Sequence, residues 1–345
     1  MSYFFLVDYF SQITVPEFKQ NLMNLGWIKL IKKKQSFLLV QIDVPTFALN
    51  SLQFLKKSIW KHLFKCLKAT PILVRIHITS NLSFLSTNNV NTGIKNVKNI
   101  ILVVSGKGGV GKSTVAANLS LSLLNKGCKV GLLDADVYGP SIPTLFNLTS
   151  KISIFAQQEN SNVSLEPIIR NGLKMMSIGF LVDTSTAMIW RGPVISSACL
   201  QLFHNVQWGD LDYLIVDMPP GTGDIHLTIA QKISVSGAVL ISTPHNLAIA
   251  DVIRIKSLLR KTNIDIFGYV ENMSYFICQK CSAKHYIFNS SEKNNYLLNI
   301  PRIIDIPIHN NLNFLHSSFE YLSSFIGLAT YKSQKSNTRN ISILD

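Results

Sequence analysis

Residues 105–114, Ser-Gly-Lys-Gly-Gly-Val-Gly-Lys-Ser-Thr, constrain the fold of this chain more than any other feature. They match the phosphate-binding pattern G-x-x-x-x-G-K-[ST]. The apolar run over residues 99–104 precedes them and predicts a buried parallel strand. Apolar residues at helical spacing follow, and Gly127 is a typical helix stop. A strand, a glycine loop and a helix N-terminus in this order indicate a phosphate site.

The residue types of this loop suit phosphate chemistry. Glycines let backbone N–H groups close around phosphate oxygens, and the following helix adds positive potential. Lys112 would reach the terminal phosphates, and the Ser113 hydroxyl would help to hold Mg²⁺. The loop carries a second lysine, Lys107, directly after its first glycine.

Length and composition exclude several protein classes. A chain of 345 residues is long enough for two domains, or for one large domain with an appendage. Hydrophobic residues make up 47%, too many for a disordered protein. No run approaches the roughly 20 apolar residues that span a bilayer. The apolar residues 3–7 lack a basic leader, so they are a poor signal peptide. We expect a soluble, cytoplasmic protein.

The chain is basic, with a formal charge of +14 from 33 Lys and Arg against 19 Asp and Glu. Such a balance raises the possibility of nucleic-acid or anionic-membrane binding. The lysines are scattered, however, and the only compact run is residues 32–34. A general drift in composition explains the charge more simply, so we expect no nucleic-acid partner and no membrane partner.

The chain divides into three parts. Residues 1–80 predict a small α+β module, with strands over 36–44 and 71–78 around a helix over 50–67. Residues 81–96 are rich in Ser, Asn and Thr and predict a linker. Residues 97–345 predict a P-loop NTPase domain of the α/β class. Its mostly parallel sheet would hold the ligand at the carboxyl ends of the strands. The later strands are predicted over residues 129–134, 211–217, 237–243, 267–270 and 303–306.

Acidic residues follow two of these strands. Asp217 ends an apolar strand, which would place its carboxylate beside the phosphate loop to hold Mg²⁺, through water. Asp134 and Asp136 would lie close enough to orient a water for attack on the γ-phosphate. Aspartates at strand ends also simply cap turns, and this alternative is serious for Asp134 and Asp136. Residues 219–224, Pro-Pro-Gly-Thr-Gly-Asp, have the stiff prolines and pivoting glycines of a switch loop.

Five cysteines, an odd and mostly isolated set, do not form a disulfide framework. Cys278 and Cys281 form a C-x-x-C pair, which serves redox chemistry, half a zinc site or half a cluster site. His285 offers a third ligand, but a fourth is not evident. Two chains meeting on a two-fold axis would complete a tetrathiolate site. Lys107 makes such pairing plausible, since a lysine this early in the loop can reach a phosphate across a dimer. An incidental surface pair is the alternative.

These motifs resemble the Mrp/ApbC family of iron–sulfur cluster carrier ATPases, within the deviant P-loop group that includes MinD, ParA and the nitrogenase iron protein. The phosphate loop alone identifies only the wider group. The specific elements are Asp-Val-Tyr-Gly-Pro-Ser at 136–141, the loop at 219–224, and the cysteine pair after Glu-Asn-Met-Ser-Tyr at 271–275. Trp-Arg-Gly-Pro at 190–193 also matches, and the likeness covers roughly residues 97–290.

The resemblance implies a set of roles. ATP would bind at residues 106–114. Lys107, Lys112, Asp136 and Asp217 would serve hydrolysis, with Lys107 reaching across a homodimer. A [4Fe–4S] cluster would be bridged by Cys278 and Cys281 of two subunits and passed to apo-proteins. Asn272 falls where related folds contact adenine. The residues expected to bind nucleotide are thus Gly106, Lys107, Gly108, Gly109, Val110, Gly111, Lys112, Ser113, Thr114 and Asn272.

Two other functions stay open at this point. A MinD- or ParA-like positioning ATPase would use a membrane or DNA as its track, but it has no need of the cysteine pair. A P-loop ATPase with a structural zinc pair would have no cargo. The sequence also departs from the family pattern at His245 and in the segment 289–306, and these changes affect the surroundings of the cluster and of the base rather than the phosphate chemistry.

Overall fold

A computed structural model describes residues 10–34, 37–67, 73–80, 94–148, 157–159, 162–180, 192–278, 280–288, 299–308, 317–335 and 342–344. The chain forms two compact units, one of residues 1–88 with 323–345, the other of residues 89–322. Most of the predicted linker, the residues Trp190 and Arg191 of one motif, and the altered segment from 289 to 298 lie outside the described residues.

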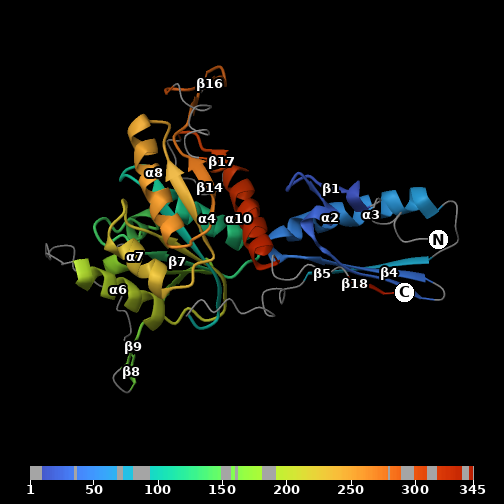
Figure 1. The fold of residues 1–345 in the computed structure, drawn as a ribbon, viewed down its shortest axis with the longest axis horizontal. Helices are drawn as coiled ribbons and strands as arrows, with labels where there is room; N and C mark the ends of the chain where they lie inside the picture. Colours follow the sequence, from blue (N-terminus) through green and yellow to red (C-terminus); the bar gives the residue numbers. More distant parts are fainter. Residues whose placement is uncertain are drawn as a thin grey trace. The chain divides into compact units, whose positions relative to one another are not determined.

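The second unit is built on an eight-stranded sheet in the order β10-β11-β7-β12-β6-β13-β14-β17. All neighbouring pairs are parallel except β10 with β11. Figure 1 labels β7, β14 and β17 of this sheet. The strands are β6 (Val97–Ser105), β7 (Val130–Asp134), β10 (Ile168–Arg170), β11 (Leu173–Ser177), β12 (Leu211–Asp217), β13 (Gly237–Ser242), β14 (Ile266–Glu271) and β17 (Arg302–Asp305). This confirms the predicted α/β fold class with a mostly parallel sheet.

Both faces of this sheet are covered by helices, which is why its central strands are apolar without alternation. The helices α6 (Gly192–Asn205), α7 (Asp224–Lys232) and α8 (Asn246–Lys261) share one buried cluster with alternate residues of the central strands. On the other face, α4 (Lys112–Asn125) packs against β6, β7 and β12. The Ser122 hydroxyl of α4 donates to the Phe319 carbonyl at the start of α10 (Ser317–Lys335).

Three strand ends meet where the phosphate loop begins. Asp217, at the end of β12, pairs in register with Val103 of β6 on one side and with Asp134 of β7 on the other. Parallel strands bring their carboxyl ends to one edge of the sheet, so the loop after β6 and the aspartates that end β7 and β12 converge. The smaller elements around this frame are α5 (Ile142–Leu145), β8 (Gln157–Glu159), β9 (Asn162–Ser164), η2 (Ile178–Phe180), β15 (Phe276–Ile277) and β16 (Lys284–His285).

The first unit is an α+β module with a four-stranded sheet in the order β18-β3-β4-β5. Its predicted elements appear as β4 (Phe37–Val44), α3 (Leu52–Leu67) and β5 (Leu73–Ser80). The other elements are β1 (Thr14–Val15), β2 (Gln20–Asn21), α2 (Leu22–Leu25), β3 (Ile28–Lys34), η1 (Thr46–Ser51) and β18 (Ser342–Leu344). The basic run at 32–34 belongs to β3, where it pairs with residues 37–39 of β4.

The C-terminal residues belong to this first unit, which corrects the prediction that the P-loop domain runs to residue 345. β18 pairs in parallel with β3, joining the two ends of the chain in one sheet. The second half of α10 completes the module's core. Its Tyr331 hydroxyl donates to the Gly26 carbonyl, and Ser324 donates to the Glu17 carboxylate. The boundary between the units therefore falls within α10.

Within the part of the chain that the structure describes, none of the helices combines the length and apolar character that crossing a membrane requires.

Gly327 of α10 packs against the N-terminal module. A Cβ atom at this position would lie 2.4 Å from Cγ of Phe47, a residue of η1 that is buried. We predict that Gly327→Leu destabilises the module by roughly 1–3 kcal/mol through overpacking. Hydrogen-exchange mass spectrometry should show faster exchange in β3 and β4, while β6 and β12 keep their protection.

The matched control is Tyr321→Leu, at an exposed position of the same helix. It should leave exchange in β3 and β4 unchanged. Equal exchange in the two variants would show that α10 is not part of the module's core.

Candidate functional site

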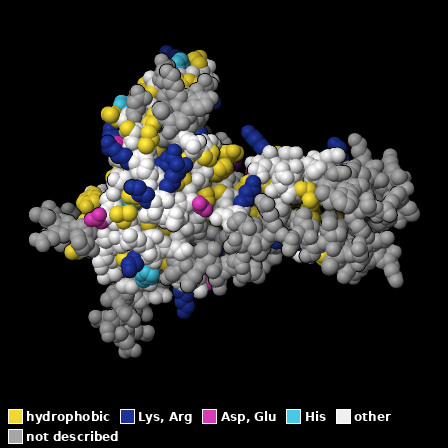
Figure 2. Space-filling model, viewed as in Figure 1, with side chains coloured by type: hydrophobic (Ala, Val, Ile, Leu, Met, Phe, Trp, Pro, Cys, Tyr) yellow, Lys and Arg dark blue, Asp and Glu magenta, His cyan; other side chains and the backbone are white. Residues whose placement is uncertain are grey.

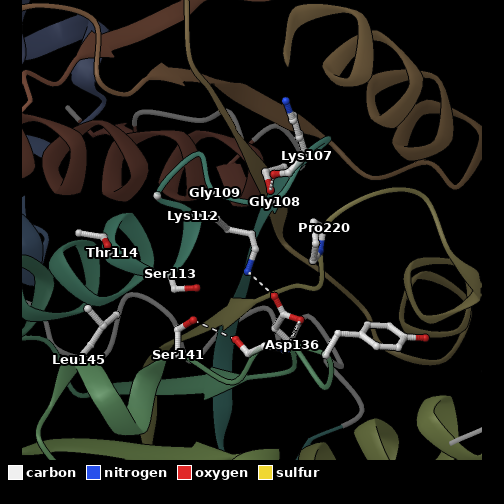
Figure 3. Close-up of a pocket in the computed structure, with 14 residues that line it drawn as sticks. Lys107, Gly108, Gly109, Lys112, Ser113, Thr114, Asp136, Ser141, Leu145 and Pro220 are labelled. Carbon is white, nitrogen blue, oxygen red and sulfur yellow. Dashed lines mark hydrogen bonds and ion pairs between the residues drawn. The ribbon is translucent and has the colours of Figure 1, made fainter. Parts of the chain in front are cut away.

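The phosphate loop lines a cavity of about 460 Å³ at the carboxyl edge of the sheet (Figure 3). Gly109 and Gly111 have φ angles of 79° and 82°, in the left-handed region that favours glycine. Gly111 directly precedes α4, so the loop's backbone turns toward the helix N-terminus. The cavity is lined by Ser105, Lys107, Gly108, Gly109, Gly111, Lys112, Ser113, Thr114, Asp136, Tyr138, Gly139, Ser141, Leu145 and Pro220. Its size and polar lining suit a polyphosphate group.

Lys112 connects the loop to both acidic residues. Its Nζ lies 2.5 Å from Oδ1 of Asp217 and 3.5 Å from Oδ2 of Asp136. The lysine side chain is only 6% exposed, so the charge is held in place by these carboxylates rather than by water. An incoming phosphate would compete for the same cation. The structure thus brings together three of the residues predicted to serve hydrolysis.

Asp217 is fully buried, with no exposed side-chain surface. Burial raises the pKa of its carboxyl group, while Lys112 and the Ser113 hydroxyl lower it. Among the described residues, its Oδ2 atom is buried without a hydrogen-bond partner. A carboxylate oxygen with an unused lone pair, next to the Ser113 hydroxyl, suits a hydrated Mg²⁺ ion. The residues present fit the predicted metal.

The surroundings of Asp134 favour the turn-capping alternative over a role in orienting water. It is fully buried and accepts hydrogen bonds from the backbone N–H groups of Asp136 and Ile142 and from the Ser177 hydroxyl. Burial, together with the charge of Asp217, raises its pKa to about 7. Asp134 therefore ties the loop after β7 to β11. Asp136, which lines the cavity, is the residue of this pair that can face substrate.

The side chains of Lys107 and Lys112 point in different directions. Figure 3 shows its side chain extending away from Lys112 and from Asp136. The Ser105 hydroxyl donates to its carbonyl oxygen at 3.0 Å, which fixes the backbone there. The ammonium group of Lys107 is therefore directed outward from the rim of its own cavity.

Asn272 lies behind the phosphate loop, at the end of β14. Its Nδ2 atom donates to the Val110 carbonyl at 2.8 Å, and a Cβ atom on Gly111 would lie 2.3 Å from the same nitrogen. Asn272 is not among the residues that line the cavity. The structure thus assigns it a hydrogen bond that supports the loop, and contact with adenine stays a prediction.

His226 is a residue of the site that the sequence did not reveal. It follows the loop at 219–224 on α7 and is only 3% exposed. It lines a second cavity of about 240 Å³, which shares Tyr138 and Pro220 with the first. Only the packing of α7 against α6 could have shown this burial, since the local pattern does not distinguish His226 from an exposed histidine.

Burial lowers the pKa of His226 to about 4, and the charge of Lys112 adds to this effect. In the unfolded chain the same imidazole titrates near its ordinary value of 6.5. The unfolded state therefore binds more protons between these values, and the free energy of unfolding falls as pH decreases. The free energy of unfolding of the wild type should therefore decrease between pH 7 and pH 5. We predict that His226→Gln makes this decrease smaller by about 2 kcal/mol.

Urea unfolding of both proteins at the two pH values measures this difference. The matched control is His204→Gln, because His204 is exposed on α6. It should keep the pH dependence of the wild type. An identical slope for His226→Gln and the wild type would mean that His226 does not stay neutral in the folded protein.

The cysteine pair lies in a hairpin formed by β15 and β16, which projects from the second unit (Figure 1). Cys278 and Cys281 occupy its turn, closed by bonds from Cys278 N to Ala283 O at 3.0 Å and from Ser282 N to Cys278 O at 2.8 Å. Hydrogen bonds from the backbone of Cys281 and Lys280 lower the pKa of the Cys278 thiol. Donor atoms of Cys278, Cys281 and His285 all lie within 4.8 Å of one another.

The sulfurs are open to a partner, since Cys278 is partly exposed and Cys281 is exposed. The other two described cysteines, Cys128 and Cys199, are buried, and burial raises the pKa of each thiol to about 12. Phe276, Ile277, Tyr286, Ile287 and Phe288 surround the pair with exposed apolar surface. Figure 2 shows hydrophobic, basic and histidine side chains together at this hairpin. Such a surface is typical of a docking site.

The phosphate loop and the exposed thiol pair thus belong to the same unit of the chain. A family model described as the NUBPL iron-transfer P-loop NTPases, of the ParA group, matches residues 96–336. The chain belongs to this family. The match includes the phosphate loop, both acidic strand ends and the cysteine hairpin.

Relatives of known name agree with the family. An iron–sulfur cluster carrier protein from Haemophilus influenzae is 40% identical over 303 residues, which cover 87% of this chain and 80% of that protein. One from Escherichia coli is 40% identical over 80% of this chain and 73% of its own length. A nucleotide-binding protein from Archaeoglobus fulgidus, solved with ADP and with cobalt, is 38% identical with a TM-score of 0.54, covering 67% of this chain and 88% of that one.

The predicted family and function class are therefore confirmed: the protein is a P-loop NTPase of the iron–sulfur carrier family. MinD- and ParA-like proteins represent only the broader group to which it belongs. The roles of the individual site residues stay predictions that follow from their geometry.

Proposed function

We propose that this protein binds and hydrolyses ATP and carries an iron–sulfur cluster between two copies of the chain, for transfer to apo-proteins. The observation that carries this proposal is the exposed Cys278–Cys281 pair on the same unit as the phosphate loop. Two thiolates make half of the usual ligand set of a cluster. A second copy of the hairpin supplies the other half, and the family resemblance implies that the cargo held by these four cysteines is a [4Fe–4S] cluster.

The nucleotide site has the parts that phosphoryl transfer needs. Residues 106–114 cradle the phosphates, and Lys112 neutralises charge on the terminal phosphate. Ser113 and Asp217 would hold Mg²⁺, which would supply charge stabilisation for the phosphoryl group that is transferred. Asp136 lines the cavity and orients the attacking water. With little general-base chemistry available, hydrolysis is slow and acts as a switch.

The outward direction of Lys107 supports a nucleotide-dependent dimer. A cation that does not serve its own cavity is available to a phosphate of the partner copy (Figure 3). ATP bound between two copies would then stabilise the same assembly that brings four cysteines together.

A short path connects the two sites within one chain. Asn272 donates to the Val110 carbonyl of the phosphate loop, and it precedes Cys278 by only a few residues. Its own N–H donates to the Ser242 carbonyl, and the Ser274 N–H donates to the Ile306 carbonyl, which anchors the base of the hairpin to the sheet. A shift of the loop on nucleotide binding would reach the cysteines through this segment.

The exposed thiols fit a reducing compartment, so we place the carrier in the cytoplasm. Apo iron–sulfur proteins are its partners, with neither nucleic acid nor membrane needed. A structural zinc site is the second candidate. It is favoured by the short distances among Cys278, Cys281 and His285.

Alanine variants of Lys107 and Lys112 should separate ATP binding from the later steps of dimerisation and hydrolysis. We predict that Lys112→Ala weakens ATP binding by at least about tenfold, because it removes the only lysine bonded to Asp217 among the described residues. Lys107→Ala should retain ATP affinity but lose ATP-dependent dimerisation and most hydrolysis. Equilibrium binding of a fluorescent ATP analogue, light scattering and phosphate release measure these three properties.

The control for charge alone is Lys232→Ala, which removes an exposed lysine from the last turn of α7. It should resemble the wild type in all three assays. Loss of ATP affinity in Lys107→Ala equal to that in Lys112→Ala would contradict the cross-dimer role.

Anaerobic reconstitution with iron and sulfide tests the cargo. The wild type should gain about one [4Fe–4S] cluster per two chains, with a broad charge-transfer absorbance, because each chain supplies half of the thiolates. Cys278→Ala with Cys281→Ala should take up none. Cys128→Ala with Cys199→Ala is the matched control and should still bind the cluster.

Transfer is measured by restored activity of an apo iron–sulfur enzyme mixed with the loaded carrier. The proposal fails if the wild type takes up zinc in stoichiometric amount and no cluster, which would make the pair structural.

A further inference from the structure

The loop at 219–224 has a cavity on each of two sides. Pro220 and Tyr138 line both the cavity of the phosphate loop, of about 460 Å³, and the second cavity, of about 240 Å³. Gly223 and His226 line the second cavity but not the first. Close packing therefore does not fix this loop on either side, and its position depends on the polar contacts that it makes.

The first half of the loop is tied to the phosphate loop. The Gly221 N–H donates to the carbonyl of Ser105, the residue that ends β6, at 3.0 Å. Gly221 has a φ of 91°, which only glycine adopts easily. The second half ends at Gly223, the N-cap residue of α7, where no side chain caps the helix. The end of the loop therefore depends on what α7 places behind it.

His226 is the residue of α7 that interacts with both ends of the loop. Its imidazole lines the second cavity together with Pro219 and Gly223 and is only 3% exposed. Its backbone N–H donates to the Gly223 carbonyl at 3.1 Å. Burial lowers the pKa of the ring, whereas the backbones of Gly223 and Pro219 act in the opposite direction, as hydrogen-bond acceptors do. One buried side chain thus spans the loop from its first residue to the helix.

The chemistry of proline decides which group of the ring is used. Pro219 has no backbone N–H, so its carbonyl is the only polar backbone group that can interact with the imidazole. The ring must therefore present an N–H donor to it. Burial and the charge of Lys112 keep the ring neutral, and a neutral imidazole has one N–H. The acidic residue that lines the same cavity is Asp224.

We propose that His226 is a positioning residue for ATP hydrolysis: its ring N–H holds the loop at 219–224 through the Pro219 carbonyl, in the position from which the loop's glycines approach the terminal phosphate. The residue acts through the loop, because it does not line the cavity of the phosphate loop. Residues 106–114 bind the nucleotide without it. The inference rests on the proposed ATPase function and adds the residue that sets its switch loop.

Two substitutions separate the N–H donor from the volume of the ring. His226→Leu fills the space without a donor, and we expect its kcat for ATP hydrolysis to fall roughly tenfold, the effect of one lost hydrogen bond in the transition state. Its affinity for a fluorescent ATP analogue should stay within about twofold of the wild type. His226→Gln keeps an N–H donor on a side chain of similar reach, so its kcat should stay within about threefold.

The matched control is Ile229→Val, one turn further along α7. Ile229 is fully buried but is not among the residues that line either cavity. Its kcat and its affinity for the analogue should equal those of the wild type. Equal kcat values in His226→Leu and the wild type would overturn the proposal. An equal loss in His226→Leu and His226→Gln would also overturn it, because the donor would then make no difference.

Hydrogen-exchange mass spectrometry gives a readout that needs no hydrolysis. Amides of residues 221–224 should exchange faster in His226→Leu than in His226→Gln, while β12 keeps its protection in both. Equal exchange in the two variants would contradict the role of His226 even if the wild type is an active ATPase. A wild type that releases no phosphate from ATP would instead refute the proposed function and leave the exchange result to decide whether His226 holds the loop.

Discussion

The buried contact between Lys112 and Asp217 is the interaction on which the nucleotide site depends. Its distance of 2.5 Å joins the end of β12 to the first residue of α4, across the loop that would surround phosphate. Removing either partner would leave an uncompensated charge in the core, so the pair fixes the loop against the sheet. The contact also keeps the site ready for an anion, because a phosphate can replace a carboxylate as the partner of Lys112.

Other side chains support the same edge of the sheet without contacting substrate. Asp134 anchors the loop after β7, and Asn272 anchors the phosphate loop to the end of β14. His226 fills the space behind the loop at 219–224 as a neutral ring. These groups are buried, so their role is to hold the position of the charged residues that line the cavity.

The cysteine hairpin is exposed, whereas the groups that support the nucleotide site are buried. Its donors are exposed, and apolar side chains around them remain open to a partner. A site that must receive and release its cargo cannot be enclosed by its own chain. Exposure leaves part of the ligand set to be supplied from outside, by a second copy of the chain in the proposed cluster carrier.

The sequence by itself determined the fold class, the phosphate loop and the residues that could hold metal, because each depends on local pattern: continuous apolar strands, glycine spacing, and two cysteines in one turn. Its predicted strands agree with β4, β6, β12 and β14 to within about three residues. It did not reveal β11, whose run Leu-Lys-Met-Met-Ser is short and carries a lysine, nor β3, where the basic run conceals a strand.

Only the tertiary structure decided which residues share an environment. It separated Asp134 from Asp136, buried His226, and joined α10 and β18 to the N-terminal module. These outcomes depend on contacts between residues far apart in the chain, such as Tyr331 with Gly26, and no local spacing records them. The residue types and their spacing were enough to predict which groups could react. The packing of distant residues decided which of these groups line the cavity and which hold the others in place.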